Sequence, residues 1–175
     1  MHFKKFHPPH LYLDNCTYFL SSRTLDKKRY FNTDHKKGIL ADILKSASKR
    51  YKIILYGWVI LENHYHLLIK VDNKKQLINF IKTLHGKSAI ELNKFENKPK
   101  RKIWVNYWDK CVESEKDFHT HLNYIHHNPI KHKYVKDMSD YKYSSYQYYL
   151  SKYGYEWLEN CFYIYPIIDF TSQDI

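Results

Sequence analysis

Two histidines separated by one residue stand inside an apolar segment of the chain. His64 and His66 flank Tyr65, and the Leu67–Ile69 run that follows is typical of a buried β-strand. Because strand side chains alternate between two faces, both imidazoles point to one side and Tyr65 to the other. A strand can thus present two nitrogen ligands to a divalent metal ion and leave coordination positions open for a phosphate oxygen. The alternative is a pair of ordinary strand histidines bonded to nearby carbonyl groups.

A second group of chemically versatile residues lies near position 124. Tyr124 and Asn128 are four residues apart in a segment with helical apolar spacing, so they lie side by side on it, with His121 next to them. Spacing alone is compatible with packing, because Tyr124 is one of 18 tyrosines. Asn128 precedes Pro129, which favours either a helix end capped there or a ligand role. Both interpretations stay open on these residues alone.

The elements that must position these groups alternate in type. Strands are expected at 11–20, 53–61 and 64–71, helices at 33–51 and 76–92, a lysine-rich loop at 94–102, and a short strand or strand pair at 103–108. This β-α-β-β-α-β order predicts an α+β fold with a ferredoxin-like antiparallel sheet and helices packed on it.

An additional helix is expected after this sheet, and it carries Tyr124. Ser114 and Asp117 form a capping-box pattern that opens it, and Phe118, Leu122 and Ile125 give its apolar stripe. The chain from 131 onward is rich in tyrosine and has no clear domain boundary. We therefore expect one domain over 1–175, with a core of about 10–130 and a C-terminal extension over 131–175.

The charge balance favours a polyanionic partner such as nucleic acid or an anionic membrane. Lys and Arg number 29 against 18 Asp and Glu, a net charge of +11, and 18 Tyr with 4 Trp exceed what a core usually needs. Aromatic rings interleaved with lysines are a common grip on single strands. The alternative is a solvated lysine-rich surface. The candidate contacts are Lys94, Lys98, Lys100, Arg101, Lys102, Trp104, Trp108, Lys131 and Lys133.

The cysteines and the hydropathy bear on the compartment. Cys16, Cys111 and Cys161 are far apart and odd in number, so no disulfide framework and no paired metal-ligand spacing is expected. No segment approaches the roughly 18 apolar residues of a membrane span. The simplest expectation is therefore a protein of the reducing cytoplasm with no membrane partner.

With these residues in view, the sequence resembles the single-tyrosine HUH transposases, in particular the REP-associated tyrosine transposases. The resemblance covers roughly 10–150 and rests on three motifs in order, which are His64-Tyr65-His66, Tyr124-Ile-His-His-Asn128-Pro129 and Asp140-Tyr-Lys-Tyr-Ser-Ser-Tyr146. The family commonly has Met-Pro-Asn before the first histidine, whereas this chain has Leu61-Glu62-Asn63, which places an extra acid beside the site.

The resemblance implies a site and a reaction. His64 and His66 would hold Mg²⁺ or Mn²⁺ with Asn128 as third ligand, and Tyr124 would be the nucleophile. The substrate would be single-stranded DNA beside a hairpin. Cleavage would give a 5′-phosphotyrosine link and a free 3′-hydroxyl, and a second 3′-hydroxyl could then join strands without ATP, as in transposition.

Several alternatives remain open at this level. His121, His127 and Lys131 are all candidates to accept the tyrosine proton, and the site is completed either within one chain or by helix exchange in a homodimer. The rival functions are a nucleic-acid-binding module without cleavage and a metal phosphodiesterase that uses water. A replication initiator or relaxase is disfavoured because such proteins usually have longer chains.

Overall fold

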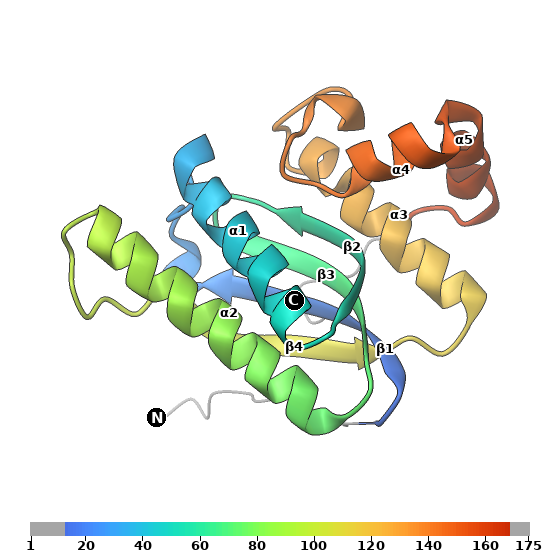
Figure 1. Cartoon of the computed structure of the whole chain (residues 1–175). Helices are drawn as coiled ribbons and strands as arrows, with labels where there is room; N and C mark the ends of the chain where they lie inside the picture. Colours follow the sequence, from blue (N-terminus) through green and yellow to red (C-terminus); the bar gives the residue numbers. More distant parts are fainter. Residues whose placement is uncertain (1–12, 169–175) are drawn as a thin grey trace, which may run out of the picture.

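A four-stranded antiparallel sheet lies at the centre of the computed structural model, which describes residues 13–168 (Figure 1). Its strands are β1 (Cys16–Thr24), β2 (Ile54–Ile60), β3 (His64–Val71) and β4 (Trp104–Cys111), in the order β2-β3-β1-β4. Hairpin partners β2 and β3 are adjacent, and β1 fits between β3 and β4. The α+β prediction with an antiparallel sheet and a β-α-β-β-α-β order is confirmed.

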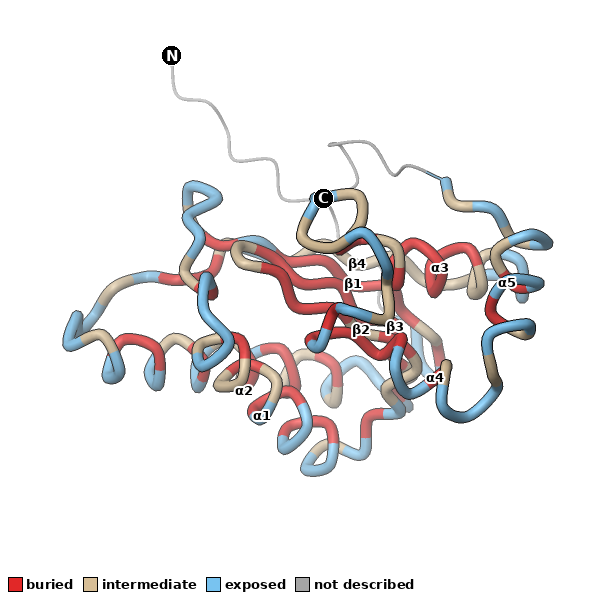
Figure 2. Tube along the Cα trace, turned by 90° about the horizontal axis from the view of Figure 1, so that it is seen from above, coloured by how far each residue is buried: buried red, intermediate tan, exposed pale blue. Residues whose placement is uncertain are grey.

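Two helices cover one face of this sheet. They are α1 (Asp34–Arg50) and α2 (Lys74–Phe95), and each begins at a side-chain cap, Thr33 for α1 and Asn73 for α2. Figure 2 shows the strands as a mostly buried layer with both helices on the same side of it. Their apolar stripes are buried against the sheet, which gives this side a continuous hydrophobic core.

A third helix, α3 (Glu115–Lys131), packs on the opposite face. Ser114 caps its start by accepting a hydrogen bond from the Asp117 amide at 3.1 Å. Packing against β2 is close at Gly57, because a Cβ there would come within 2.8 Å of Leu122 Cδ1. The helix that carries Tyr124 therefore lies directly over the sheet.

Of the two interpretations left open at Asn128, the helix end does not occur, because α3 continues through Pro129. Proline lacks its own amide donor, and its ring crowds the carbonyl four residues earlier. The later amides still find acceptors, since His132 N bonds to Asn128 O at 3.0 Å and Tyr134 N to Pro129 O at 2.9 Å. Asn128 is thus an interior helix residue and not a cap.

The chain after α3 folds back against α3 and β2. It contains two short helices, α4 (Tyr146–Tyr153) and α5 (Tyr155–Ile164), after the 3₁₀ turn η2 (Met138–Asp140). Tyr141 donates a hydrogen bond to Ile60 O and Tyr149 to Tyr56 O, each at 2.8 Å. These contacts cover the outer edge of β2, a strand edge that would otherwise be open to pairing. The division at 131 remains a prediction.

Several element limits differ from expectation. The first strand runs over Cys16–Thr24 instead of 11–20, and positions 11 and 12 lie outside the described residues. Its polar end stays in the sheet because β3 and β4 both pair with it. A 3₁₀ turn, η1 (Leu25–Lys27), follows, and α2 extends into the expected loop. Of the two expected alternatives, β4 is a single strand, and it runs on to Cys111.

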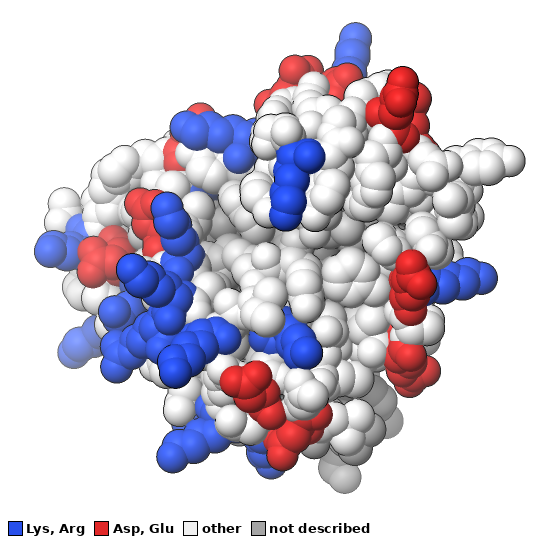
Figure 3. Space-filling view, turned by 45° about the vertical axis from the view of Figure 1, so that its right-hand side comes forward, with Lys and Arg blue, Asp and Glu red and all other residues white. Residues whose placement is uncertain are grey.

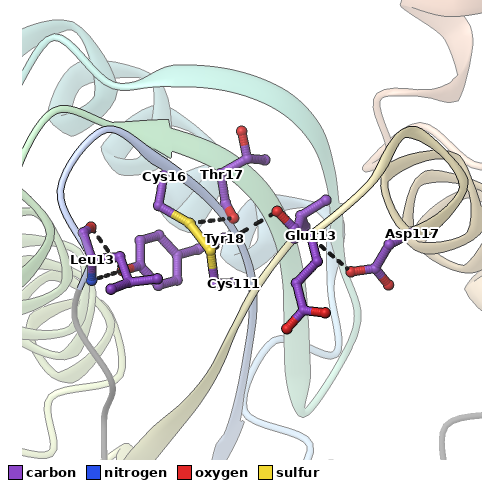
Figure 4. Close-up of a disulfide and its surroundings, with 8 residues drawn as sticks. Leu13, Cys16, Thr17, Tyr18, Cys111, Glu113 and Asp117 are labelled. Atoms are coloured by element: carbon purple, nitrogen blue, oxygen red, sulfur yellow. Dashed lines mark hydrogen bonds between the residues drawn. A yellow bond between two sulfur atoms is a disulfide. The ribbon is translucent and has the colours of Figure 1, made fainter.

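Cys16 and Cys111 form a disulfide between β1 and β4 (Figure 4), so the expectation of no disulfide is wrong. The two residues are 95 positions apart, but strand pairing sets Tyr18 opposite Cys111 and brings the two Cα atoms within 6.4 Å. Cys161 is buried and not disulfide-bonded. Across residues 13–168, no helix has both the length and the apolar character needed to cross a membrane.

Candidate active site

The two histidines of β3 face α3. Their rings lie 5.1 Å apart between centroids, and both side chains are buried. Tyr65 points to the opposite face, where its hydroxyl lies 2.7 Å from Nε2 of His85 on α2. The alternation expected from the sequence is therefore present, and an interior strand holds both imidazoles at fixed positions.

Helix α3 brings Tyr124 and Asn128 to the same place. The ring of Tyr124 lies 5.3 Å from that of His66, and Phe19 of β1 packs against both rings, at 5.5 Å from His66 and 6.0 Å from Tyr124. Asn128 Nδ2 donates to the carbonyl of Tyr124 at 3.1 Å, which fixes the amide plane. The residues from two distant motifs thus meet in one buried cluster.

Burial sets the protonation of the two histidines. The pKa of His64 falls to about 3, through burial first and the positive charge of His132 second, against the nearby Asn128 side chain, which raises it. The pKa of His66 also falls well below its ordinary value, through burial first and the charge of His64 second. Both imidazoles are therefore neutral near pH 7, which leaves lone pairs for a metal ion.

The donor atoms of this cluster fit a divalent metal. Within residues 13–168, both ring nitrogens of His66 and Oδ1 of Asn128 are buried without a hydrogen-bond partner. His64 Nδ1 lies 2.7 Å from Asn63 Oδ1, a contact that orients the ring and leaves Nε2 for a ligand role. The same described part of the chain has no cluster of three or more His, Cys, Asp or Glu suited to a metal. The buried Oδ1 of Asn128 is the candidate for a third protein ligand.

The candidate proton acceptors surround Tyr124 in different settings. His121 is buried, with Nδ1 2.7 Å from Asp117 O and 3.1 Å from Asp117 Oδ1. Burial lowers the pKa of His121, while Asp117 raises it. Lys131 Nζ lies 5.0 Å from the centre of the Tyr124 ring, and His127 is half-buried on the same helix.

The structure separates the two tryptophans proposed for base stacking. Trp108 lies on the face of the histidines, 6.0 Å from Phe19. Trp104 is buried on the opposite face, where its ring stacks on His85 at 4.9 Å and its Nε1 donates to Ser88 Oγ at 2.9 Å. No base can reach it there, so Trp104 is a core residue and its predicted role is corrected.

The basic candidates also fall into separate groups. Arg101 forms a 2.5 Å ion pair with Glu96, which ties it to the loop after α2. The remaining ones of that loop are exposed, and so is Lys133 at the end of α3, whereas Lys131 is half-buried. The exposed lysines are Lys98, Lys100 and Lys102 in the loop and Lys94 in the last turn of α2.

Lysines and arginines also gather on the side of α1 and α2. Figure 3 shows lysines and arginines crowded on the left and lower left of the surface in that view. The exposed members on α1, α2 and the turns beside them are Lys45, Lys49, Arg50, Lys52, Lys74, Lys75, Lys82, Lys87 and Lys94. The predicted set includes only one of these residues.

His132 is a site residue that the sequence analysis missed. Its ring lies 4.8 Å from that of His64, and its charge lowers the pKa of both strand histidines. It follows Asn128 by four residues, a helical spacing that would have found it. The possible helix end before Pro129 obscures that spacing in the sequence.

Known proteins resemble this chain. Residues 12–128 match the family model described as Transposase IS200 like. A Haemophilus influenzae protein assigned provisionally as a REP-associated tyrosine transposase is 29% identical over 139 residues, covering 74% of this chain and 78% of that protein. The REP-associated tyrosine transposase of Escherichia coli is 23% identical over 136 residues, covering 77% and 79%.

A solved structure has the same fold. It is that of a REP-associated tyrosine transposase bound to a REP hairpin, with a TM-score of 0.68 at 19% identity, covering 86% of this chain and 88% of that one. The predicted resemblance is therefore confirmed at the level of family and fold. The chain belongs to the IS200-like transposase family of enzymes.

Proposed function

We propose that this transposase is a metal-dependent single-stranded DNA endonuclease and strand transferase that uses Tyr124 as its nucleophile. The main support is the position of Tyr124 on α3, where its ring centre lies 5.3 Å from that of His66. The neutral imidazole of His64 and the buried Oδ1 of Asn128 belong to the same cluster. This arrangement supports a phenol aimed at a phosphate that is bound at the same histidines.

Mg²⁺ or Mn²⁺ held by His64, His66 and Asn128 would polarise a nonbridging oxygen of the scissile phosphate. The protein has its own part in activating Tyr124. A phenol with an ordinary pKa near 10 is a weak nucleophile at neutral pH. The Lys131 side chain lies over this ring, with Nζ 5.0 Å from the ring centre.

In the proposed cleavage, Tyr124 Oη forms a bond to phosphorus and the bond from phosphorus to the 3′ oxygen breaks. His121, His127 or Lys131, in its unprotonated form, takes the phenol proton, and this proton passes to the leaving 3′ oxygen, which becomes a hydroxyl. The products are a 5′-phosphotyrosine link and a free 3′-hydroxyl. Attack by another 3′-hydroxyl reverses the step and joins strands without ATP, because the ester energy is retained.

DNA with a hairpin is the proposed substrate. The relative of known structure was bound to a REP hairpin. The net charge of +11 supports a polyanionic ligand, and Trp108 on the face of the histidines is available as an aromatic contact. We propose a cytoplasmic location, where such DNA is accessible, and action as a monomer or a homodimer.

A covalent-adduct assay tests this function. Wild-type protein is mixed with end-labelled single-stranded DNA hairpins and Mn²⁺, and the products are separated on a denaturing gel. A labelled protein band is expected that disappears in Tyr124→Phe and with EDTA. Tyr163→Phe is the matched control, because Tyr163 is 86% exposed and should leave the band unchanged.

Other outcomes of the assay contradict the proposal in distinct ways. Cleavage without an adduct in both wild type and Tyr124→Phe would indicate a water-using phosphodiesterase. Binding without cleavage would indicate a nucleic-acid-binding module of the same fold.

A further inference from the structure

An open hollow of about 810 Å³ lies just beyond the C-terminal end of α3. We propose that this α3-end hollow binds one unpaired nucleotide of the DNA strand and selects a base that carries an exocyclic amino group. The inference rests on the proposed function, since it names a nucleotide subsite for the same substrate. The hollow is lined by Ile130, Lys133, Tyr134, Val135, Lys136 and Asp140.

The α3-end hollow is connected to the site through a row of rings. His132 lies 4.8 Å from His64, and Tyr134 lies 6.5 Å from His132. Burial raises the pKa of Tyr134, and so does the negative charge of Glu62, which lies in the turn just before His64. A strand whose phosphate is held at the histidines therefore passes this hollow with a neighbouring nucleotide.

The ring of Tyr134 provides a fixed surface for stacking. Its amide donates to Pro129 O at 2.9 Å, which anchors the backbone to the last turn of α3. Its ring lies 5.8 Å from Tyr141, whose hydroxyl is itself held by Ile60 O at 2.8 Å. A half-buried ring supported in this way can stack on a base at little entropic cost.

Two exposed lysines supply positive charge at the rim. Lys133 has a φ of +59°, in the left-handed region that non-glycine residues seldom adopt, and its amide bonds to Ile130 O at 2.9 Å. This reversal at the helix end turns the chain so that Lys133 and Lys136 line the same hollow. Their ammonium groups suit the phosphates on either side of a stacked base.

Asp140 gives the hollow its selectivity. An ionised carboxylate only accepts hydrogen bonds, so it pairs with the amino group of cytosine and opposes the carbonyl that thymine has at the same ring position. Asp140 is exposed and held in the η2 turn, where its amide bonds to Asp137 O at 3.2 Å. The two pyrimidines are equal in size, which makes them a matched pair of probes.

The first test measures binding without cleavage. Fluorescein-labelled DNA hairpins that are blunt, or that carry a single-stranded oligo-dC or oligo-dT extension, are titrated with protein in EDTA. Wild type should favour the dC over the dT extension by about fivefold or more, and Asp140→Ala should remove that preference. An unchanged dC to dT ratio in Asp140→Ala would overturn the selectivity.

Variants of the aromatic and basic groups locate the contact. Tyr134→Leu, and Lys133→Ala with Lys136→Ala, should each weaken binding of both extended hairpins by about fivefold or more and leave the blunt hairpin unchanged. Lys142→Ala is the control, because this exposed lysine packs over Tyr143 and is outside the hollow. Equal losses for blunt and extended hairpins in folded variants, verified by thermal melting, would overturn the proposal.

Photocrosslinking gives an independent location. A hairpin with 5-iodo-deoxycytidine in its extension should crosslink to Tyr134, whereas a crosslink confined to α1 and α2 would overturn the subsite. The nucleotide subsite and the strand-transfer function can be contradicted independently of each other. Loss of the preference in Asp140→Ala together with a missing Tyr124 adduct in wild type would support the hollow and contradict the strand transfer.

Discussion

The two faces of the β-sheet bury different kinds of groups, although the same strands supply both. On the side of α1 and α2, β3 contributes Leu67 and Ile69 to a core of aliphatic and aromatic side chains. On the side of α3, the same strand contributes His64 and His66 to a cluster with Tyr124. Neighbouring residues of one strand thus serve packing and chemistry in turn, since their side chains alternate.

The difference has an energetic meaning. Apolar burial stabilises a fold by about 25 cal/mol per Å² removed from water, and the side of α1 and α2 gains this contribution fully. Buried polar atoms without partners, such as the ring nitrogens of His66 and Asn128 Oδ1, oppose folding. The face of α3 therefore gives up stability in order to keep desolvated ligand atoms together.

Substitution of His66 should have the largest effect on activity. We expect His66→Leu to lower adduct formation to background, at least about a thousandfold, because a metal ligand is lost. Folding should be retained or improved by about 1 kcal/mol, since a buried polar ring with no partner is replaced by an apolar group. The gel assay and urea unfolding measure the two effects, and marked destabilisation would contradict the division between the faces.

The adjacent residue should give the opposite result. Leu67→Ala removes a buried side chain from the core on the other face and should cost about 2–5 kcal/mol of unfolding free energy. The protein that remains folded should still form the adduct with Tyr124. Urea unfolding together with adduct yield per folded molecule checks this, and activity loss without destabilisation would be the contrary result.

Metal binding should stabilise the face of α3. At a hundredfold excess over its dissociation constant, Mn²⁺ should raise the unfolding free energy by about 2.7 kcal/mol, and EDTA should reverse the gain. Asn128→Leu should reduce this gain, because it removes the amide oxygen from the donor set. Thermal melting with and without Mn²⁺ tests both statements, and an equal gain in wild type and variant would exclude Asn128 as a ligand.

The side of α1 and α2 should respond to acid through His85. Burial lowers the pKa of His85 to about 3, so the unfolded chain binds more protons than the folded one below about pH 6.5. Stability is then full above about pH 6.5 and decreases as the pH falls toward 3, by about 1 kcal/mol per pH unit from this residue. Urea unfolding at pH 7 and 5.5 should show a shallower dependence in His85→Gln, and an identical one would refute it.

Periodic and local features could be predicted from the sequence. The alternation that sends His64 and His66 to one face, and the cap at Ser114, follow from backbone geometry over a few residues. The four-residue spacing likewise predicted that Tyr124 and Asn128 are neighbours on a helix, and the structure has Asn128 donating to the Tyr124 carbonyl. The three motifs also identified the family.

Features that join distant segments could not be predicted in this way. Cys16 meets Cys111 only because β1 and β4 pair, and Trp104 is buried only because α2 covers its face of the sheet. Composition alone gave these residues the opposite assignments, since neither pairing nor coverage has a local signal.

The chain by itself therefore determined the repeating geometry of each element and the residues capable of chemistry. Tertiary structure decided that the Tyr124 helix lies across the histidine face, and that His132 joins the cluster beyond Pro129. The physical reason is range. Dihedral preferences and side-chain periodicity act over a few residues, whereas burial and strand pairing depend on which distant segments the whole fold brings into contact.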